Sequence, residues 1–177
     1  MADDLWRRSA TTLADLIRTK QTSCQEVVES HLGRIEAVNG RLNAITVVLA
    51  DSAMVAAAEA DRREPTGPLH GVPFTIKENI DCLDSATTRG VPALADSMPS
   101  LDAPVVARMK AAGAIPLGRT NLPELGMRIT TDNPLHGRTL NPWNADRTPG
   151  GSSGGEASAL ASGMSPRAST PPCERLW

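Results

Sequence analysis

Near its C-terminal end the chain carries a block of glycine and serine that leads directly into an alanine-rich stretch, TPGGSSGGEASALASG, from Thr148 to Gly163. Four glycines flank two adjacent serines, Ser152 and Ser153. Glycine tolerates positive φ angles and close backbone approach, so the block can hold its serines in a geometry that other residues resist. Because alanine favours helix, we expect the serines to lie just before the N-terminus of a buried helix.

The glycine-serine block allows several interpretations. A phosphate-binding loop is disfavoured because no lysine follows the glycines at the required position. A nucleophile elbow needs Gly-x-Ser-x-Gly, which the segment from Gly151 to Gly154 does not match. A flexible linker is disfavoured because linkers do not usually lead into strong helix formers. A further interpretation is a serine held in a special backbone geometry beside a lysine base, and the linker stays open as its alternative.

Lys77 is the candidate base. It follows the apolar run VPFTI, which predicts a strand from Val72 to Ile76 that carries the lysine into the interior. Burial disfavours the ammonium form, and a neutral lysine can act as a general base for a serine. The alternative is an ordinary lysine at a strand end whose amine extends to water.

Composition excludes several other classes of protein. The 177 residues have a net charge of −2, no Tyr and a single Phe, which argues against a nucleic-acid partner. No 18-residue apolar run predicts a membrane span, and the first residues lack the apolar core of a secretory signal. Cys24, Cys82 and Cys173 are too far apart for a disulfide framework or a zinc site. We expect a cytoplasmic protein with no metal and no cofactor.

Hydrophobic periodicity predicts an α/β domain, with helices alternating with short apolar strands. A capping box of Ser23 and Glu26 starts one helix, which we expect to stop at Asn39-Gly40. Asp102 is the predicted cap of a later helix. The expected helices cover residues 9–20, 23–38, 52–63 and 102–112, and the expected strands cover residues 45–49, 72–76 (in a central position) and 114–117. The segment 118–151 is rich in turn-forming residues, as functional loops often are.

Taken together, the segments resemble the amidase signature family. GPLHGVPFTIKENID is similar to its lysine segment, and TLNPWNADRTPGGSSGGEASALASGMSP is similar to its signature block. DAPVVARMKAAGAIPLGRTNLPELG and the N-terminal helices also fit the family in the right order. The resemblance covers roughly residues 9–166. It implies hydrolysis of carbon-nitrogen (amide) bonds by a Ser-Ser-Lys triad.

The resemblance implies a role for each matching residue. Lys77 is the expected catalytic base, and Ser152 is the expected bridging serine, preceded by a cis peptide bond. Ser153 is expected to support the loop, together with the glycines that surround it: Gly150, Gly151, Gly154 and Gly155.

The family's nucleophilic serine has no counterpart. The family places it in a second glycine-serine motif about 24 residues after the bridging serine, where this chain has Leu176, and no further Gly-Gly-Ser follows Ser153. We therefore expect an incomplete amidase-signature fold in residues 1–166, with a mixed central sheet and covering helices, truncated before the nucleophile segment. Residues 167–177 are expected to form an aberrant tail unrelated to the family.

These observations lead to one preferred function and two alternatives. The preferred function is an amidase-type hydrolase of small-molecule amides. The 177-residue chain itself is expected to be a truncated, inactive fragment. The first alternative is the amidase subunit of a tRNA-dependent amidotransferase, which Glu156 disfavours because that branch more often has a small polar residue there. The second is a non-catalytic fragment or binding module.

Overall fold

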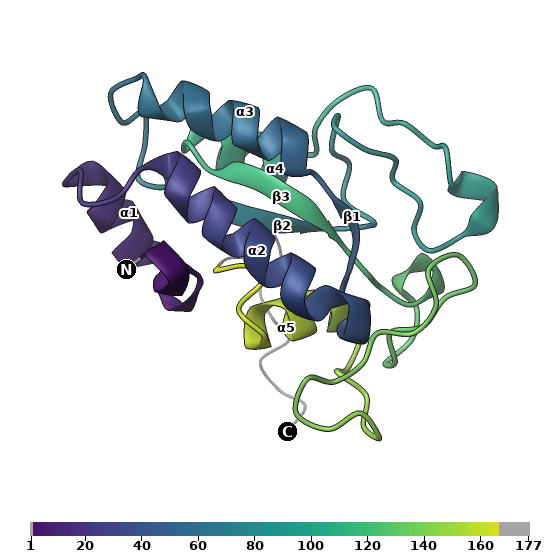
Figure 1. Cartoon of the computed structure of the whole chain (residues 1–177). Helices are drawn as coiled ribbons and strands as arrows, with labels where there is room; N and C mark the ends of the chain where they lie inside the picture. The colour runs from purple at the N-terminus through teal and green to yellow at the C-terminus, as the bar shows by residue number, and fades with distance from the viewer. Residues whose placement is uncertain (1, 167–177) are drawn as a thin grey trace.

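The computed structural model describes residues 2–166, which form a mixed α/β structure around a three-stranded sheet (Figure 1). The strands are β1 (Ile45–Val48), β2 (Pro73–Lys77) and β3 (Ile115–Thr120), in the order β1-β3-β2. β1 pairs antiparallel with β3, and β2 pairs parallel with it. The expected α/β class and mixed sheet are confirmed. The central position expected for β2 is wrong in the described part of the chain, because β3 lies between the other two strands.

Helices cover both faces of the sheet. The α-helices are α1 (Ala10–Arg18), α2 (Cys24–Leu42), α3 (Ala50–Asp61), α4 (Pro104–Ala111) and α5 (Gly154–Ala161). Short 3-10 helices are η1 (Ala2–Arg7), η2 (Pro92–Leu94) and η3 (Glu124–Gly126). Figure 1 shows α2 and α3 side by side in front of the sheet, with α4 behind it.

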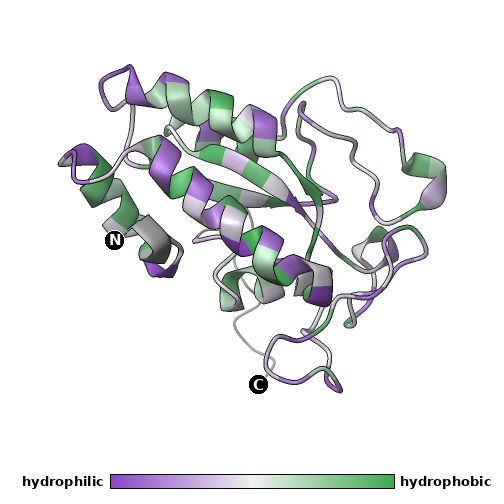
Figure 2. Cartoon of the chain, in the orientation of Figure 1, coloured by the Kyte–Doolittle hydropathy of each residue, from purple (hydrophilic) through white to green (hydrophobic). Residues whose placement is uncertain are grey.

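Strand alternation divides the core between the two faces. Phe74 and Ile76 of β2 pack with Val106 of α4 in a smaller apolar cluster. The larger cluster joins α1, α2 and α3 to the opposite side of the sheet. Along α2, hydrophilic and hydrophobic residues alternate as expected for a helix with one buried face (Figure 2). Because successive side chains of a strand point to opposite faces, Thr75 and Lys77 face away from the Phe74 cluster.

Two residues expected to mark helix ends do not do so. α2 begins with the predicted capping box but continues past Asn39-Gly40 to Leu42, and Asn43 caps it in the left-handed region with φ 50°. The Asn39 side chain does not end the helix, because it bridges to the next strand: its Oδ1 accepts from the Ile45 amide at 2.9 Å. Asp102 does not cap α4, because its carboxylate accepts from the Leu83 amide at 2.9 Å and pairs with Lys110.

Candidate active site

Lys77 and Ser152 meet in the folded chain. Lys77 is the last residue of β2 and is 5% exposed. Its Nζ donates a hydrogen bond to the Ser152 Oγ at 2.8 Å. The two residues are 75 positions apart, so their contact depends on the sheet and α5 coming together. The structure thus brings the candidate base and the expected bridging serine into hydrogen-bond contact.

The backbone before Ser152 takes the form that the family resemblance predicts. The Gly151–Ser152 peptide bond is cis. Gly150 has φ 92°, a region that favours glycine. A Cβ atom on Gly151 would lie 2.6 Å from the Arg128 carbonyl oxygen, so a side chain does not fit there. Backbone conformation and close packing thus account for glycine at both positions.

The second pair of glycines places the loop against the sheet. Ser153 is the N-cap residue of α5, as the alanine-rich sequence predicts, although its side chain makes no capping hydrogen bond. Gly154 and Gly155 form the first turn of the helix and are buried. A Cβ atom on Gly155 would lie 2.8 Å from the Ala44 carbonyl oxygen, so α5 can approach the chain before β1 this closely only with glycine there.

Thr131 and Asn121, which no sequence motif identifies, brace the loop. The Thr131 Oγ1 donates to the Gly150 carbonyl at 2.9 Å and accepts from the Gly154 amide at 3.1 Å. The Asn121 carbonyl accepts from the Gly155 amide at 3.2 Å. Both residues belong to the polar segment 118–151. The unusual length of this segment was the one sequence feature that pointed to a functional role for it.

Glu156 is a further buried group of the site that was not predicted. It lies in the first turn of α5 and is fully buried. The Thr75 Oγ1 donates to its Oε2 at 2.7 Å. Burial raises the pKa of Glu156 to about 7, and the hydroxyls of Thr75 and Thr120 and the charge of Lys77 oppose that rise. The charge of this carboxyl therefore changes near neutral pH.

Glu78, the residue after Lys77, belongs to a separate buried cluster. Its carboxylate accepts hydrogen bonds from Thr46 at 2.5 Å and from Thr88, and lies 3.4 Å from the His136 Nε2. Desolvation alone would raise the pKa of Glu78, but the hydrogen bonds from His136 and the two threonines outweigh it and lower the pKa. None of its partners, Thr46, Thr88 and His136, takes part in the contact between Lys77 and Ser152.

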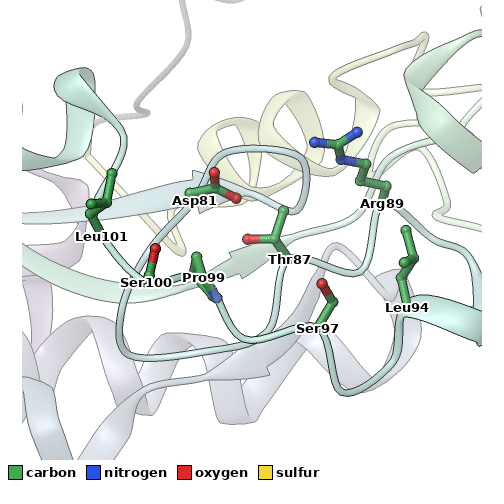
Figure 3. Close-up of a pocket in the computed structure, with 8 residues that line it drawn as sticks. All are labelled: Asp81, Thr87, Arg89, Leu94, Ser97, Pro99, Ser100 and Leu101. Carbon is green, nitrogen blue, oxygen red and sulfur yellow. The ribbon is translucent and has the colours of Figure 1, made fainter.

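A cavity of about 420 Å³ opens in the segment between β2 and α4 (Figure 3). It is lined by Asp81, Thr87, Arg89, Leu94, Ser97, Pro99, Ser100 and Leu101. None of these residues belongs to the Lys77–Ser152 pair or its bracing loop. The cavity is therefore distinct from the candidate active site.

The described residues contain neither a metal-binding group nor a membrane-spanning helix. Within residues 2–166, no group of three or more His, Cys, Asp and Glu side chains could hold a metal ion. No helix of this described part is long and apolar enough to cross a membrane. Leu176, at the expected position of the nucleophile, and the predicted tail 167–177 lie outside the described residues.

Comparison with known proteins identifies the family. The family model described as Amidase matches residues 26–170. The chain belongs to the amidase family. The chain is 51% identical over 164 residues to the indoleacetamide hydrolase of Bradyrhizobium diazoefficiens, covering 90% of this chain and 31% of that protein. It is 41% identical over 167 residues to a glutamyl-tRNA(Gln) amidotransferase subunit of Salinispora tropica, covering 92% of this chain and 34% of the relative.

Solved structures show the same relationship. A bacterial aryl acylamidase of the amidase signature family superimposes with a TM-score of 0.85 at 37% identity, covering 89% of this chain and 34% of that one. A fatty acid amide hydrolase superimposes with a TM-score of 0.89 at 28% identity, covering 93% of this chain and 30% of that one. The chain thus spans about a third of the length of the relatives it matches.

Proposed function

We propose that residues 1–166 supply the lysine part of a Ser-Ser-Lys amidase site. In this site Lys77 is the base and Ser152 relays a proton between Lys77 and a nucleophilic serine. The observation that carries the proposal is the 2.8 Å hydrogen bond from the Lys77 Nζ to the Ser152 Oγ, beside the cis Gly151–Ser152 bond. A buried lysine in contact with a serine is the arrangement that activates a serine without histidine.

The proposed reaction begins when the nucleophilic serine forms a bond to the amide carbonyl carbon. Its proton passes to the Ser152 Oγ, and the Ser152 proton passes to the Lys77 amine. The carbon-nitrogen bond then breaks, and the leaving nitrogen takes a proton back through the same relay. Water attacks the acyl-enzyme in the second half of the reaction and releases the acid, which regenerates the serine. Gly150, Gly151, Ser153, Gly154 and Gly155 hold the relay serine in place.

We propose further that the 177-residue chain does not carry out this reaction by itself. It contains no second Gly-Gly-Ser motif, and Leu176 occupies the position expected for the nucleophile. In this proposal residues 1–166 are the N-terminal part of one domain, and residues 167–177 are unrelated to the family. Without a nucleophile, the covalent route is closed.

Small-molecule amides are the proposed substrates of the complete protein, since the relative at 51% identity is an indoleacetamide hydrolase. The second candidate is an amidotransferase subunit, which the 41% identity to the Salinispora tropica protein favours. Glu156 argues against that branch, where a small polar residue is more usual at this position. Hydrolysis of glutamine by a completed chain, dependent on partner subunits, would favour the second candidate.

A hybrid enzyme tests the proposal directly. Residues 1–166 are fused to the rest of the Bradyrhizobium diazoefficiens relative, and release of ammonia from indoleacetamide is measured. We expect the hybrid to be active and the Lys77→Ala and Ser152→Ala variants to lose roughly 10⁴-fold or more in rate. Lys20→Ala, at an exposed lysine in the turn after α1, serves as the control and keeps full activity. An active Lys77→Ala hybrid would refute the assignment of the base.

The unmodified chain provides the complementary test. We expect no amide hydrolysis and no labelling by a fluorophosphonate serine probe. Labelling that disappears in the Lys77→Ala variant would show that a nucleophilic serine is present and that Leu176 was the wrong position to consider.

A further inference from the structure

The carboxyl of Glu156 is incompletely satisfied inside the protein. Its Oε2 accepts from Thr75, but its Oε1 has no hydrogen-bond partner within the described residues. The Thr120 Oγ1 lies near this carboxyl but outside hydrogen-bond geometry, and it too lacks a partner there. Buried polar groups normally find partners, so a fully buried carboxyl with one unused oxygen calls for an explanation.

The position of Glu156 relative to Lys77 supplies an explanation for this unused oxygen. Thr75 and Lys77 are two positions apart on β2 and therefore share a face of the sheet. Thr120 pairs with Lys77 in the neighbouring strand β3. Glu156, which contacts Thr75 from α5, lies against this same face, and its carboxyl and the lysine charge interact. Ser152, which receives the Lys77 hydrogen bond, lies four positions before Glu156 in the chain.

We propose that Glu156 is a positioning residue whose carboxylate is a buried counter-charge for Lys77, and that it sets the pH at which the lysine releases its proton. When the carboxyl is ionised, it stabilises the ammonium form of Lys77. When it is neutral, the lysine loses its proton more readily. The inference deepens the proposed function, because a base must be neutral to accept the proton that Ser152 relays.

The charges around the pair make this coupling specific. Toward Glu156, β2 presents Thr75 and Lys77 and β3 presents Thr120, and Lys77 is the charged group among them. Glu78, which follows β2, is held by its own hydrogen bonds and by His136, and Arg119 donates to backbone carbonyls. Since Glu156 has a pKa of about 7, the charge facing Lys77 changes within the neutral range.

Nuclear magnetic resonance of the full 177-residue chain can test the coupling without catalysis. The sequence has three lysines, Lys20, Lys77 and Lys110, so labelling lysine with ¹³C at the ε carbon gives a simple spectrum. A Lys77→Arg variant assigns the Lys77 signal. Glu156→Gln removes the charge but keeps the shape and an oxygen that can accept from Thr75. Glu59→Gln removes an exposed carboxylate of α3 as the matched control.

We expect the wild-type Lys77 signal to shift in two steps, one near pH 7 as Glu156 ionises and one at higher pH as the lysine itself deprotonates. In Glu156→Gln the first step is lost and the second moves to lower pH by roughly one unit, the low end of the effect of a nearby opposite charge. The Lys20 and Lys110 signals stay unchanged, as does Lys77 in Glu59→Gln. An unchanged Lys77 titration in Glu156→Gln overturns the proposal.

A Thr75→Val variant identifies the group whose ionisation causes the step near pH 7. It also serves as the test if the Glu156→Gln variant does not fold. Loss of the Thr75 hydroxyl destabilises the carboxylate form of Glu156 and raises its pKa, so the first step moves to higher pH. A step that stays in place belongs to another group, such as a histidine, and overturns the proposal. A wild-type Lys77 signal that shows no step near pH 7 also overturns the proposal. These outcomes do not depend on whether the hybrid enzyme hydrolyses amides, so the two proposals can fail separately.

Discussion

Single residues fix the geometry of the candidate site through a few buried polar contacts. Thr131 is the clearest case, because one hydroxyl donates to the Gly150 carbonyl and accepts from the Gly154 amide. It therefore joins the two ends of the loop that presents Ser152. Two buried backbone groups depend on this hydroxyl, so the position has little freedom to change.

Replacement of Thr131 by valine tests this role. Valine has a similar shape but leaves the Gly154 amide and the Gly150 carbonyl without their partner, and we expect a loss of about 2 kcal/mol in the free energy of unfolding. Urea denaturation of the 177-residue chain measures it. Thr130→Val, at the exposed neighbouring position, serves as the control and should change stability little. Equal stability of the two variants would show that Thr131 does not brace the loop.

At the scale of elements, α2 organises the larger core. This 19-residue helix packs against α3 and η1, and its buried face includes Val27, Val28 and Ile35. Its start is defined by the reciprocal capping box, in which the Ser23 Oγ accepts from the Glu26 amide at 3.1 Å and the Glu26 carboxylate accepts from the Ser23 amide at 2.8 Å. These bonds satisfy amides at the helix N-terminus that have no partner within the helix.

The capping box provides a prediction for this element. Ser23→Ala removes one of the two reciprocal hydrogen bonds, so we expect the free energy of unfolding to fall by about 1 kcal/mol. Thermal or urea denaturation followed by circular dichroism measures the change. Ser100→Ala, at an exposed serine outside any helix or strand, should leave stability within experimental error. A Ser23→Ala variant as stable as the wild type would mean that water replaces the cap at no cost.

For the molecule as a whole, the region beside the candidate site is notable for exposed apolar side chains. Leu125 is 50% exposed, Met127 79% and Ile129 74%. The segment lies beside the loop that holds Ser152, because a Cβ atom on Gly126 would lie 4.0 Å from the Ser152 Cβ. Apolar surface gathered in one place usually marks a binding or interaction site, whereas scattered apolar residues carry no such meaning.

A fluorescent probe of apolar surface tests whether these residues form one patch. We expect the 177-residue chain to bind anilinonaphthalene sulfonate and the combined Met127→Ser, Ile129→Ser variant to bind it more weakly, because the patch has been made polar. Val55→Ser changes a 62% exposed valine of α3 and should leave the fluorescence unchanged. If both variants bound the probe as the wild type does, the apolar patch would lie elsewhere.

Local features of this protein follow from its amino-acid order alone. Hydrophobic periodicity, the Ser23 capping box and the apolar run before Lys77 specify helices and strands through contacts between near neighbours in the chain. The two long motifs around Lys77 and Ser152 indicate the family. Helix ends are less predictable: the Asn39-Gly40 pair predicts a stop, yet the Asn39 side chain bonds to the start of β1 while the helix continues.

Which distant residues meet depends on the folded chain. The sequence offers Lys77 and Ser152 as partners from their settings and from the family resemblance, but the 2.8 Å contact requires β2 and α5 to pack together. Thr131 lies in no motif, and Glu156 lies in the glycine-serine block without being predicted as a site residue, because their roles come from the groups that face them after folding. A side chain's chemistry depends on its burial and its neighbours. Both are set by packing between segments that are far apart in the chain.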